Sequence, residues 1–147
     1  NRKASFAVYK AREKEPNSYY FYESDMEESI NRRLNMSHEL KTAIEEEQFE
    51  LFYQPKVDLA TNQFVGAEAL IRWRKGDTII SPAEFIPVAE ESGLIIEIGR
   101  WALETACAEC AKWQNNGLKG MTVAVNLSPV QFKRGNLPNH VFRALQK

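Results

Sequence analysis

The amino-acid sequence predicts an α/β fold, and more specifically the N-terminal part of a TIM-type (β/α)8 barrel that the chain does not complete. Three segments (51–59, 64–73 and 121–127) place apolar side chains at alternate positions, which is typical of strands with one buried face. Helical patterns separate the second strand from the third, as in a β/α alternation. A closed barrel of this type needs about 250 residues, and the chain has 147.

The second face of each predicted strand carries the polar residues. In the middle strand the odd-numbered positions are all apolar, whereas the even-numbered positions include Glu68 and Arg72. The even positions of the first and third strands include Gln54 and Asn126. In a β/α barrel these side chains would face the interior and meet where the strands end. The pattern alone also allows an ordinary α/β sheet whose polar residues are satisfied locally.

Glu68 is the most informative of these residues. An ionised carboxylate on a covered strand costs several kcal/mol unless a cation or strong hydrogen bonds compensate it. We therefore expect Glu68 to have a partner. Arg72 lies on the same face, but an extended strand separates the two by about 13 Å, so an ion pair would require a bend after Ala69.

Two helices and a short strand are expected before the first barrel strand. Residues 3–14 resemble a helix and 19–22 a strand, with a break at Pro16. Residues 24–27 have capping-box spacing, and the charged helix that follows is expected to break near Ser37.

Capping signals set the limits of the later helices. A turn at 75–77 leads directly to Ser81-Pro82, with Glu84 completing a helix start, and Gly93 ends that helix. The expected order is ββααβα, with later helices over 94–115, near 129–133 and from 138. The long helix is expected to bury a stripe that includes Cys110 and to place Cys107 at its edge.

Composition excludes several classes of function. The net charge of −1 gives no basic surface for DNA or RNA. No apolar run approaches the ~18 residues of a membrane span. Cys107 and Cys110 have no second cysteine pair with which to form a zinc site, so reduced thiols in the cytoplasm are expected. The chain begins without methionine, which suggests a piece of a longer protein.

Four ordered motifs resemble those of EAL domains, the bacterial phosphodiesterases and receptors for cyclic di-GMP. The resemblance covers about 39–147. The matching motifs are Tyr53-Gln54-Pro55, Glu68-Ala69-Leu70 followed by Ile71-Arg72-Trp73, Ser81-Pro82-Ala83-Glu84-Phe85-Ile86-Pro87, and Val125-Asn126-Leu127-Ser128.

The resemblance implies a modified β/α barrel that uses Mg²⁺ or Mn²⁺ to hydrolyse cyclic di-GMP to linear pGpG. Glu68 and Asn126 would then be catalytic residues and metal ligands through oxygen atoms, which suits these cations. Gln54, Leu70 and Arg72 would bind the dinucleotide, with Arg72 on a phosphate.

The resemblance also implies a domain organisation. Residues 1–24 are similar to the end of a GGDEF domain, 25–38 would be a helical linker, and 39–147 would be the N-terminal half of an EAL domain. The family's later catalytic motifs would lie beyond Lys147, so the fragment itself is expected to be inactive. The alternative is a degenerate EAL domain that acts as a cyclic di-GMP receptor or scaffold. A homodimer through the EAL domain or an open barrel edge is expected, in the cytoplasm, with any membrane anchor elsewhere in the parent.

Overall fold

The computed structural model describes residues 24–146 of the chain. The chain divides into two compact units, 1–38 and 39–147, which are considered separately. The helix and strand expected within residues 3–22 lie outside the described residues. Helix α2 (Ser24–Glu45) is continuous, so the predicted break near Ser37 is wrong. Its sequence contains neither proline nor glycine, and nothing interrupts the helical hydrogen bonds.

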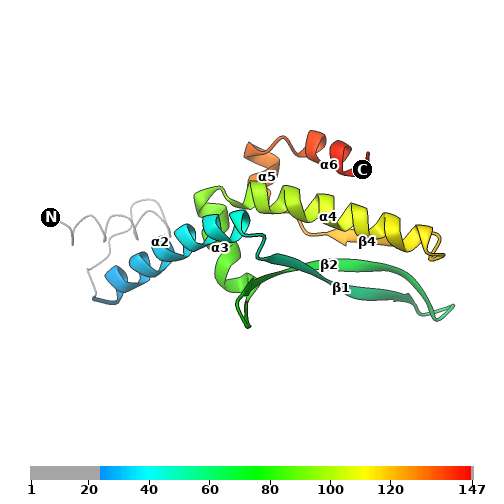
Figure 1. The fold of residues 1–147 in the computed structure, drawn as a ribbon, viewed down its shortest axis with the longest axis horizontal. Helices are drawn as coiled ribbons and strands as arrows, with labels where there is room; N and C mark the ends of the chain where they lie inside the picture. Colours follow the sequence, from blue (N-terminus) through cyan, green and yellow to red (C-terminus); the bar gives the residue numbers. More distant parts are fainter. Residues whose placement is uncertain (1–23, 147) are drawn as a thin grey trace. The chain divides into compact units, whose positions relative to one another are not determined.

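An open, mixed sheet forms the base of the second unit (Figure 1). Strand β2 is central: one long strand pairs antiparallel with it, a short strand pairs antiparallel at its end, and a third pairs parallel. Within the described residues the sheet does not close, as in part of a barrel. The strands are β1 (Phe49–Asp58), β2 (Gln63–Lys75), β3 (Thr78–Ile80) and β4 (Thr122–Val125).

Strand β3 is absent from the sequence prediction, which placed a helix directly after the turn at 75–77. In the structure Thr78 pairs with Lys75 and Ile80 pairs with Trp73. Gly76 permits this tight turn because it adopts the left-handed conformation, with φ 59°. The observed order is therefore βββααβα after α2, with one further helix at the end.

The helices of the second unit follow the predicted capping signals closely. The Ser81 hydroxyl accepts a hydrogen bond from the Ala83 amide at 3.4 Å, and Gly93 ends the first of these helices in the left-handed conformation. In Figure 1, α4 runs beside β4. The helices are α3 (Pro82–Ser92), α4 (Ile95–Asn115), α5 (Pro129–Arg134) and α6 (Leu137–Leu145).

The odd-numbered face of the sheet packs under the helices, as the sequence predicts. Phe49 of β1 and Trp73 of β2 are buried, and both rings lie 5.8 Å from the ring of Phe85 of α3. Trp101 of α4 completes this aromatic cluster at 6.1 Å from Phe49. The indole N–H of Trp73 donates to the Gln48 side chain at 3.0 Å, so its one polar group is satisfied.

Cys107 is partly buried, in agreement with its predicted place at the edge of the buried stripe, whereas Cys110 is less buried than predicted. Cys110 is only partly buried, and its thiol lies 3.5 Å from the Met121 carbonyl oxygen. Cys107 packs against a buried cluster of α4 and α6 that contains Leu103 and Leu137. This cluster forms because α6 docks on this side of α4, a contact that the pattern of α4 alone does not reveal.

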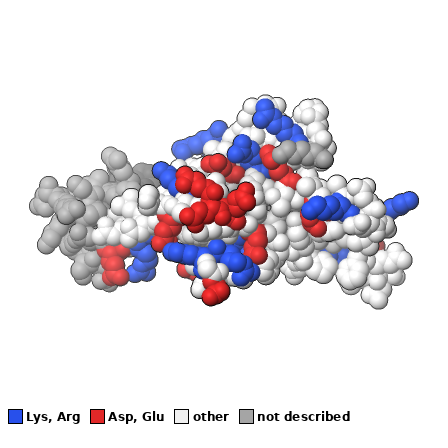
Figure 2. Space-filling view, in the orientation of Figure 1, with Lys and Arg blue, Asp and Glu red and all other residues white. Residues whose placement is uncertain are grey.

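Charged side chains of both signs are mixed on the surface. On the face shown in Figure 2, acidic and basic side chains lie next to one another among the described residues. This agrees with the net charge of −1. No helix in residues 24–146 is both long and apolar enough to cross a membrane.

Candidate functional site

The strand register brings the predicted site residues to one face of the sheet. Gln54 of β1 lies opposite Glu68 of β2, and Ala124 of β4 lies opposite Glu68 on the other side. Side chains alternate along a strand, so Asn126, two residues after Ala124, falls on the same face. Because β1 runs antiparallel to β2, Gln54 reaches this face from the middle of its strand, and the expectation that all strands end together is wrong for β1.

Glu68 and Asn126 are in direct contact although 58 residues separate them in the sequence. The Asn126 side-chain Nδ2 donates a hydrogen bond to Glu68 Oε1 at 2.8 Å. Glu68 therefore has the partner that the sequence predicts, and that partner is an amide. Glu68 is half-buried and Asn126 is exposed. The face is open in the described residues because no further strand continues the sheet over it.

Arg72 and Leu70 extend the row of side chains along β2, and both are half-buried. The Arg72 guanidinium lies 5.5 Å from the centre of the Phe52 ring, and its Nη1 donates to the Ile71 carbonyl oxygen at 2.8 Å. Arg72 thus makes no ion pair with Glu68, and the alternative of a structural pair between them is wrong. Gln54 is exposed beside Glu68.

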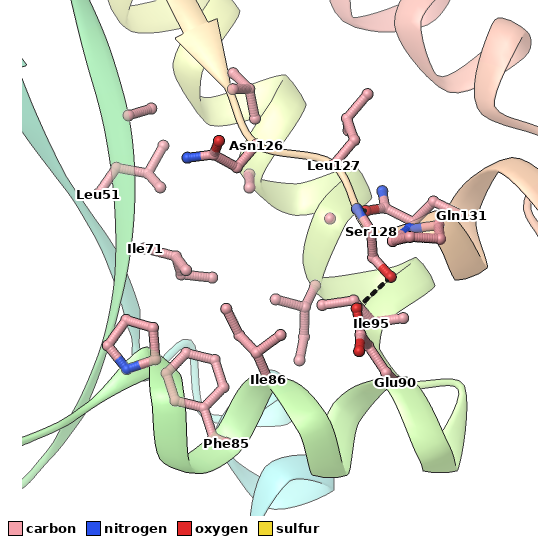
Figure 3. Close-up of a pocket in the computed structure, with 17 residues that line it drawn as sticks. Leu51, Ile71, Phe85, Ile86, Glu90, Ile95, Asn126, Leu127, Ser128 and Gln131 are labelled. Carbon is pink, nitrogen blue, oxygen red and sulfur yellow. Dashed lines mark hydrogen bonds between the residues drawn. The ribbon is translucent and has the colours of Figure 1, made fainter. Parts of the chain in front are cut away.

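The connection from β4 to α5 holds a polar network next to Asn126 (Figure 3). The Ser128 hydroxyl donates to Glu90 Oε1 of α3 at 2.6 Å and accepts from the Val130 amide at 3.1 Å. The Ser128 amide donates to Gln131 Oε1 at 2.9 Å, which completes a capping box. Glu90 and Gln131 are not among the residues that the sequence predicts for the site. The spacing of Ser128 and Gln131 is a detectable signal, whereas nothing local marks Glu90.

A cavity of about 270 Å³ lies on the other face of the sheet, between the strands and helices α3, α4 and α5. Apolar side chains such as Ile71, Phe85 and Ile98 make up most of its lining, and Asn126 and Ser128 lie at its border (Figure 3). The lining of this cavity suits nonpolar groups. The carboxylate of Glu68 and the guanidinium of Arg72 lie on the opposite face of the sheet. We therefore place the candidate site on the even-numbered face.

The candidate residues on the even-numbered face are one carboxylate, two amides and one guanidinium: Glu68, Gln54, Asn126 and Arg72. Carboxylate and amide oxygens are hard donors that suit Mg²⁺, Mn²⁺ or Ca²⁺, and a guanidinium suits a phosphate. Among the described residues, no group of three or more His, Cys, Asp or Glu side chains could hold a metal ion.

Comparison with known proteins gives consistent matches. A family model described as the EAL domain matches residues 37–147. The chain is 39% identical over 143 residues to the bifunctional diguanylate cyclase/cyclic di-GMP phosphodiesterase MucR of Pseudomonas aeruginosa. It is 38% identical over 132 residues to the oxygen sensor protein DosP of Escherichia coli. These alignments cover 97% and 88% of this chain but only 21% and 16% of the relatives.

Solved structures share the fold. The PaMucR phosphodiesterase in complex with cyclic di-GMP aligns with a TM-score of 0.71 and 40% identity, over 76% of this chain and 46% of that one. The FimX EAL domain of Xanthomonas citri in complex with the same dinucleotide aligns with a TM-score of 0.65 and 26% identity, over 84% of this chain and 47% of that one.

Proposed function

The chain belongs to the EAL domain family, and from this we propose that it forms the N-terminal half of a domain that hydrolyses cyclic di-GMP to linear pGpG. The observation that carries the proposal is the contact of 2.8 Å between Glu68 and Asn126 on the face opposite the helices. The relatives support the proposal, because MucR is named a cyclic di-GMP phosphodiesterase and the solved structure of the PaMucR phosphodiesterase is a complex with cyclic di-GMP.

Glu68 and Asn126 would hold Mg²⁺ or Mn²⁺ in this proposal. Their oxygen atoms are of the right type, and the two side chains are adjacent. When bound, such an ion stabilises negative charge on the phosphate and activates water. Two residues do not fill an octahedral shell, so further ligands must come from water, substrate phosphate or other parts of the protein.

The Asn126 amide has to turn before its oxygen can share an ion with Glu68. In the structure its Nδ2 faces Glu68 and donates to it. The terminal torsion of asparagine is broad and roughly two-fold, so a half-turn exchanges Nδ2 and Oδ1 without moving the backbone. Asn126 would then hold the Glu68 carboxylate in place when no ion is bound and contribute an oxygen when one is.

Arg72, Gln54 and Leu70 would bind the dinucleotide. The cation–π contact with the Phe52 ring would keep the Arg72 guanidinium on the site face, where it can bind a phosphate with two parallel hydrogen bonds. The Gln54 side chain makes no hydrogen bond among the residues described and is exposed beside Glu68, so it is available to a ligand. Leu70 lies between Glu68 and Arg72 and would supply an apolar contact.

We extend the proposal to the parent protein. The chain spans about a fifth of MucR, and the alignment with that bifunctional protein covers 97% of the chain. This supports residues 1–24 as the end of a GGDEF-like domain, 25–38 as a linker and 39–147 as half of an EAL domain. One edge of β4 is unpaired in the part of the chain that the structure describes, and it would allow two chains to associate. The unpaired cysteines fit a reducing cytoplasm.

The test compares cyclic di-GMP turnover with Mn²⁺ by the 147-residue chain and by the longer protein proposed here. We expect turnover only from the longer protein. Glu68→Gln and Asn126→Ala in that protein should each lower turnover by about 100-fold or more, because loss of a residue that merely supports a metal ligand already costs about 10- to 100-fold. Glu84→Gln, which alters an exposed carboxylate of α3, serves as the matched control.

Each alternative has its own outcome. Turnover by the 147-residue chain at the level of the longer protein would contradict the expected inactivity of the fragment. Normal turnover by the Glu68→Gln variant would contradict the role of Glu68. Binding of cyclic di-GMP by the longer protein without any turnover would indicate a receptor in place of an enzyme.

A further inference from the structure

We propose that Glu90, Ser128 and Gln131 form a positioning clamp that fixes the connection between β4 and α5 and thereby sets the place of Asn126. The proposal rests on the function proposed above for Asn126. The three side chains touch neither Glu68 nor the face on which a ligand would bind. Their effect on the reaction would therefore pass through Asn126.

Ser128 is held by both its backbone and its side chain. Its hydroxyl donates to Glu90 Oε1 at 2.6 Å and accepts from the Val130 amide at 3.1 Å. Its own amide donates to Gln131 Oε1 at 2.9 Å. Ser128 is 8% exposed, so water does not readily replace these bonds. A hydrogen bond to a charged carboxylate is among the stronger ones in proteins.

Gln131 anchors the clamp to α4. Its side chain is 2% exposed and lies directly against Gly99, where an added Cβ would come within 2.1 Å of Nε2. That Nε2 has no hydrogen-bond partner within the described residues. An unpaired buried amide group destabilises the folded chain, so the side chain is held there by its packing and by the bond that its Oε1 accepts from Ser128. The clamp thus joins α5 to α3 through Glu90 and to α4 through Gln131.

Asn126 lies between two fixed points of the chain. On one side Val125 pairs with Ala69 of β2, and on the other Leu127 packs against the cluster of α4 and α6 just before Ser128. The only side-chain hydrogen bond of Asn126 among the described residues is the one to Glu68. In Figure 3 the Ser128 hydroxyl points to Glu90, while the Asn126 amide points away from that pair.

The direction of the Asn126 side chain is therefore determined by the backbone that the clamp holds. A displacement of about 1 Å is enough to impair a ligand of this kind, because reacting groups tolerate only small errors in position. Loss of the clamp should weaken metal binding through Asn126 even though no ligand atom is removed. Loss of a residue that supports a metal ligand typically lowers metal affinity 10- to 100-fold.

The first experiment observes Asn126 directly, without metal or substrate, by NMR of its side-chain amide in the 147-residue chain. Ser128→Ala and Glu90→Ala should move this resonance to the position seen in Glu68→Ala. Glu90→Gln retains an oxygen acceptor and should leave the resonance unchanged. Ser81→Ala is the matched control, because Ser81 also caps a helix before a proline but lies far along the chain from Asn126.

The second experiment measures Mn²⁺ binding by the longer protein, using the EPR signal of free Mn²⁺. Ser128→Ala and Glu90→Ala should raise the dissociation constant about 10-fold, and Glu90→Gln and Ser81→Ala should not. In an Asn126→Ala background, Ser128→Ala should have no further effect, because both changes act through the same ligand.

The outcomes separate the clamp from simple helix capping and from failure of the proposed function. If Ser128→Ala lowers stability as Ser81→Ala does but leaves both the Asn126 resonance and Mn²⁺ affinity unchanged, the clamp is only a helix cap and the proposal is overturned. If Glu68→Ala and Asn126→Ala do not alter Mn²⁺ binding, the proposed function fails, and the NMR result still decides on the clamp.

Discussion

Replacing Gly99 with alanine tests the packing of α4 against α5 through the sign of its effect on stability. Gly99 is buried in α4, and an alanine Cβ would lie 2.1 Å from Nε2, 2.6 Å from Cδ and 2.8 Å from Oε1 of Gln131. Carbon atoms in proteins do not approach other heavy atoms this closely without displacement. Gln131 must therefore move, or α4 and α5 must separate.

The expected change in the free energy of unfolding combines a gain and a loss. Alanine is favoured over glycine in a helix interior by about 1 kcal/mol. Rotation of Gln131 out of the way leaves the buried Ser128 amide unpaired, at a cost of about 1–3 kcal/mol. If Gln131 stays in place, overpacking costs about 1–3 kcal/mol instead. We expect Gly99→Ala to destabilise the chain by roughly 1 kcal/mol after the helix gain is subtracted.

Urea denaturation followed by circular dichroism measures this difference. The matched background is Gln131→Ala, which removes all three close atoms at once. In that background Gly99→Ala should stabilise the chain, by up to about 1 kcal/mol. A reversal of sign between the two backgrounds is the expected result. An increase in stability from Gly99→Ala in the otherwise unchanged chain would refute the packing argument.

Two further predictions concern pH and association. Burial, with smaller contributions from Glu109 and Cys110, raises the pKa of Tyr53 from 10.0 to about 12. The stability that this shift contributes to the folded chain is complete below pH 10.0 and is lost as the pH rises toward 12. Tyr53→Phe should therefore reduce the fall in the free energy of unfolding at alkaline pH. A tyrosine absorbance titration showing Tyr53 ionising at its ordinary pKa would contradict this prediction. One edge of β4 pairs with no strand in residues 24–146, and Phe142 and Leu145 have exposed side chains, so we predict that the 147-residue chain self-associates. Size-exclusion chromatography with light scattering should show dimers or larger species, and a clean monomer would count against it.

The sequence alone predicted the features that depend on the regular alternation of side chains along a strand or on local capping residues. Side chains alternate along strands, so the shared face of Glu68 and Asn126 followed from their positions in the apolar pattern. The start of α3 at Ser81 and its end at Gly93 followed from local capping chemistry. These features depend on neighbouring residues and on a fixed period, and both are visible in one sequence.

The features that the sequence did not predict depend on distant contacts or on very short segments. Strand β3 has three residues, too few to display a period. Cys107 became part of a packed cluster because α6 docks beside it, which no helix pattern of α4 alone reveals. The bond from Ser128 to Glu90 joins residues 38 positions apart. Its detection required the relative placement of α3 and α5.

The reversed direction of β1 bears on the order in which the site assembles. A short turn joins β1 to β2, so Gln54 and Glu68 can come together early through local pairing. We expect Asn126 to join them later, because α3 and α4 separate β2 from β4 in the sequence and the pairing of β4 with β2 is a long-range contact. We therefore expect conditions that loosen the helical layer to detach Asn126 first, while the hairpin that carries the acid and the arginine survives. The contact between Glu68 and Asn126 is then expected to form late in folding, and it would indicate that the helices have packed on the sheet.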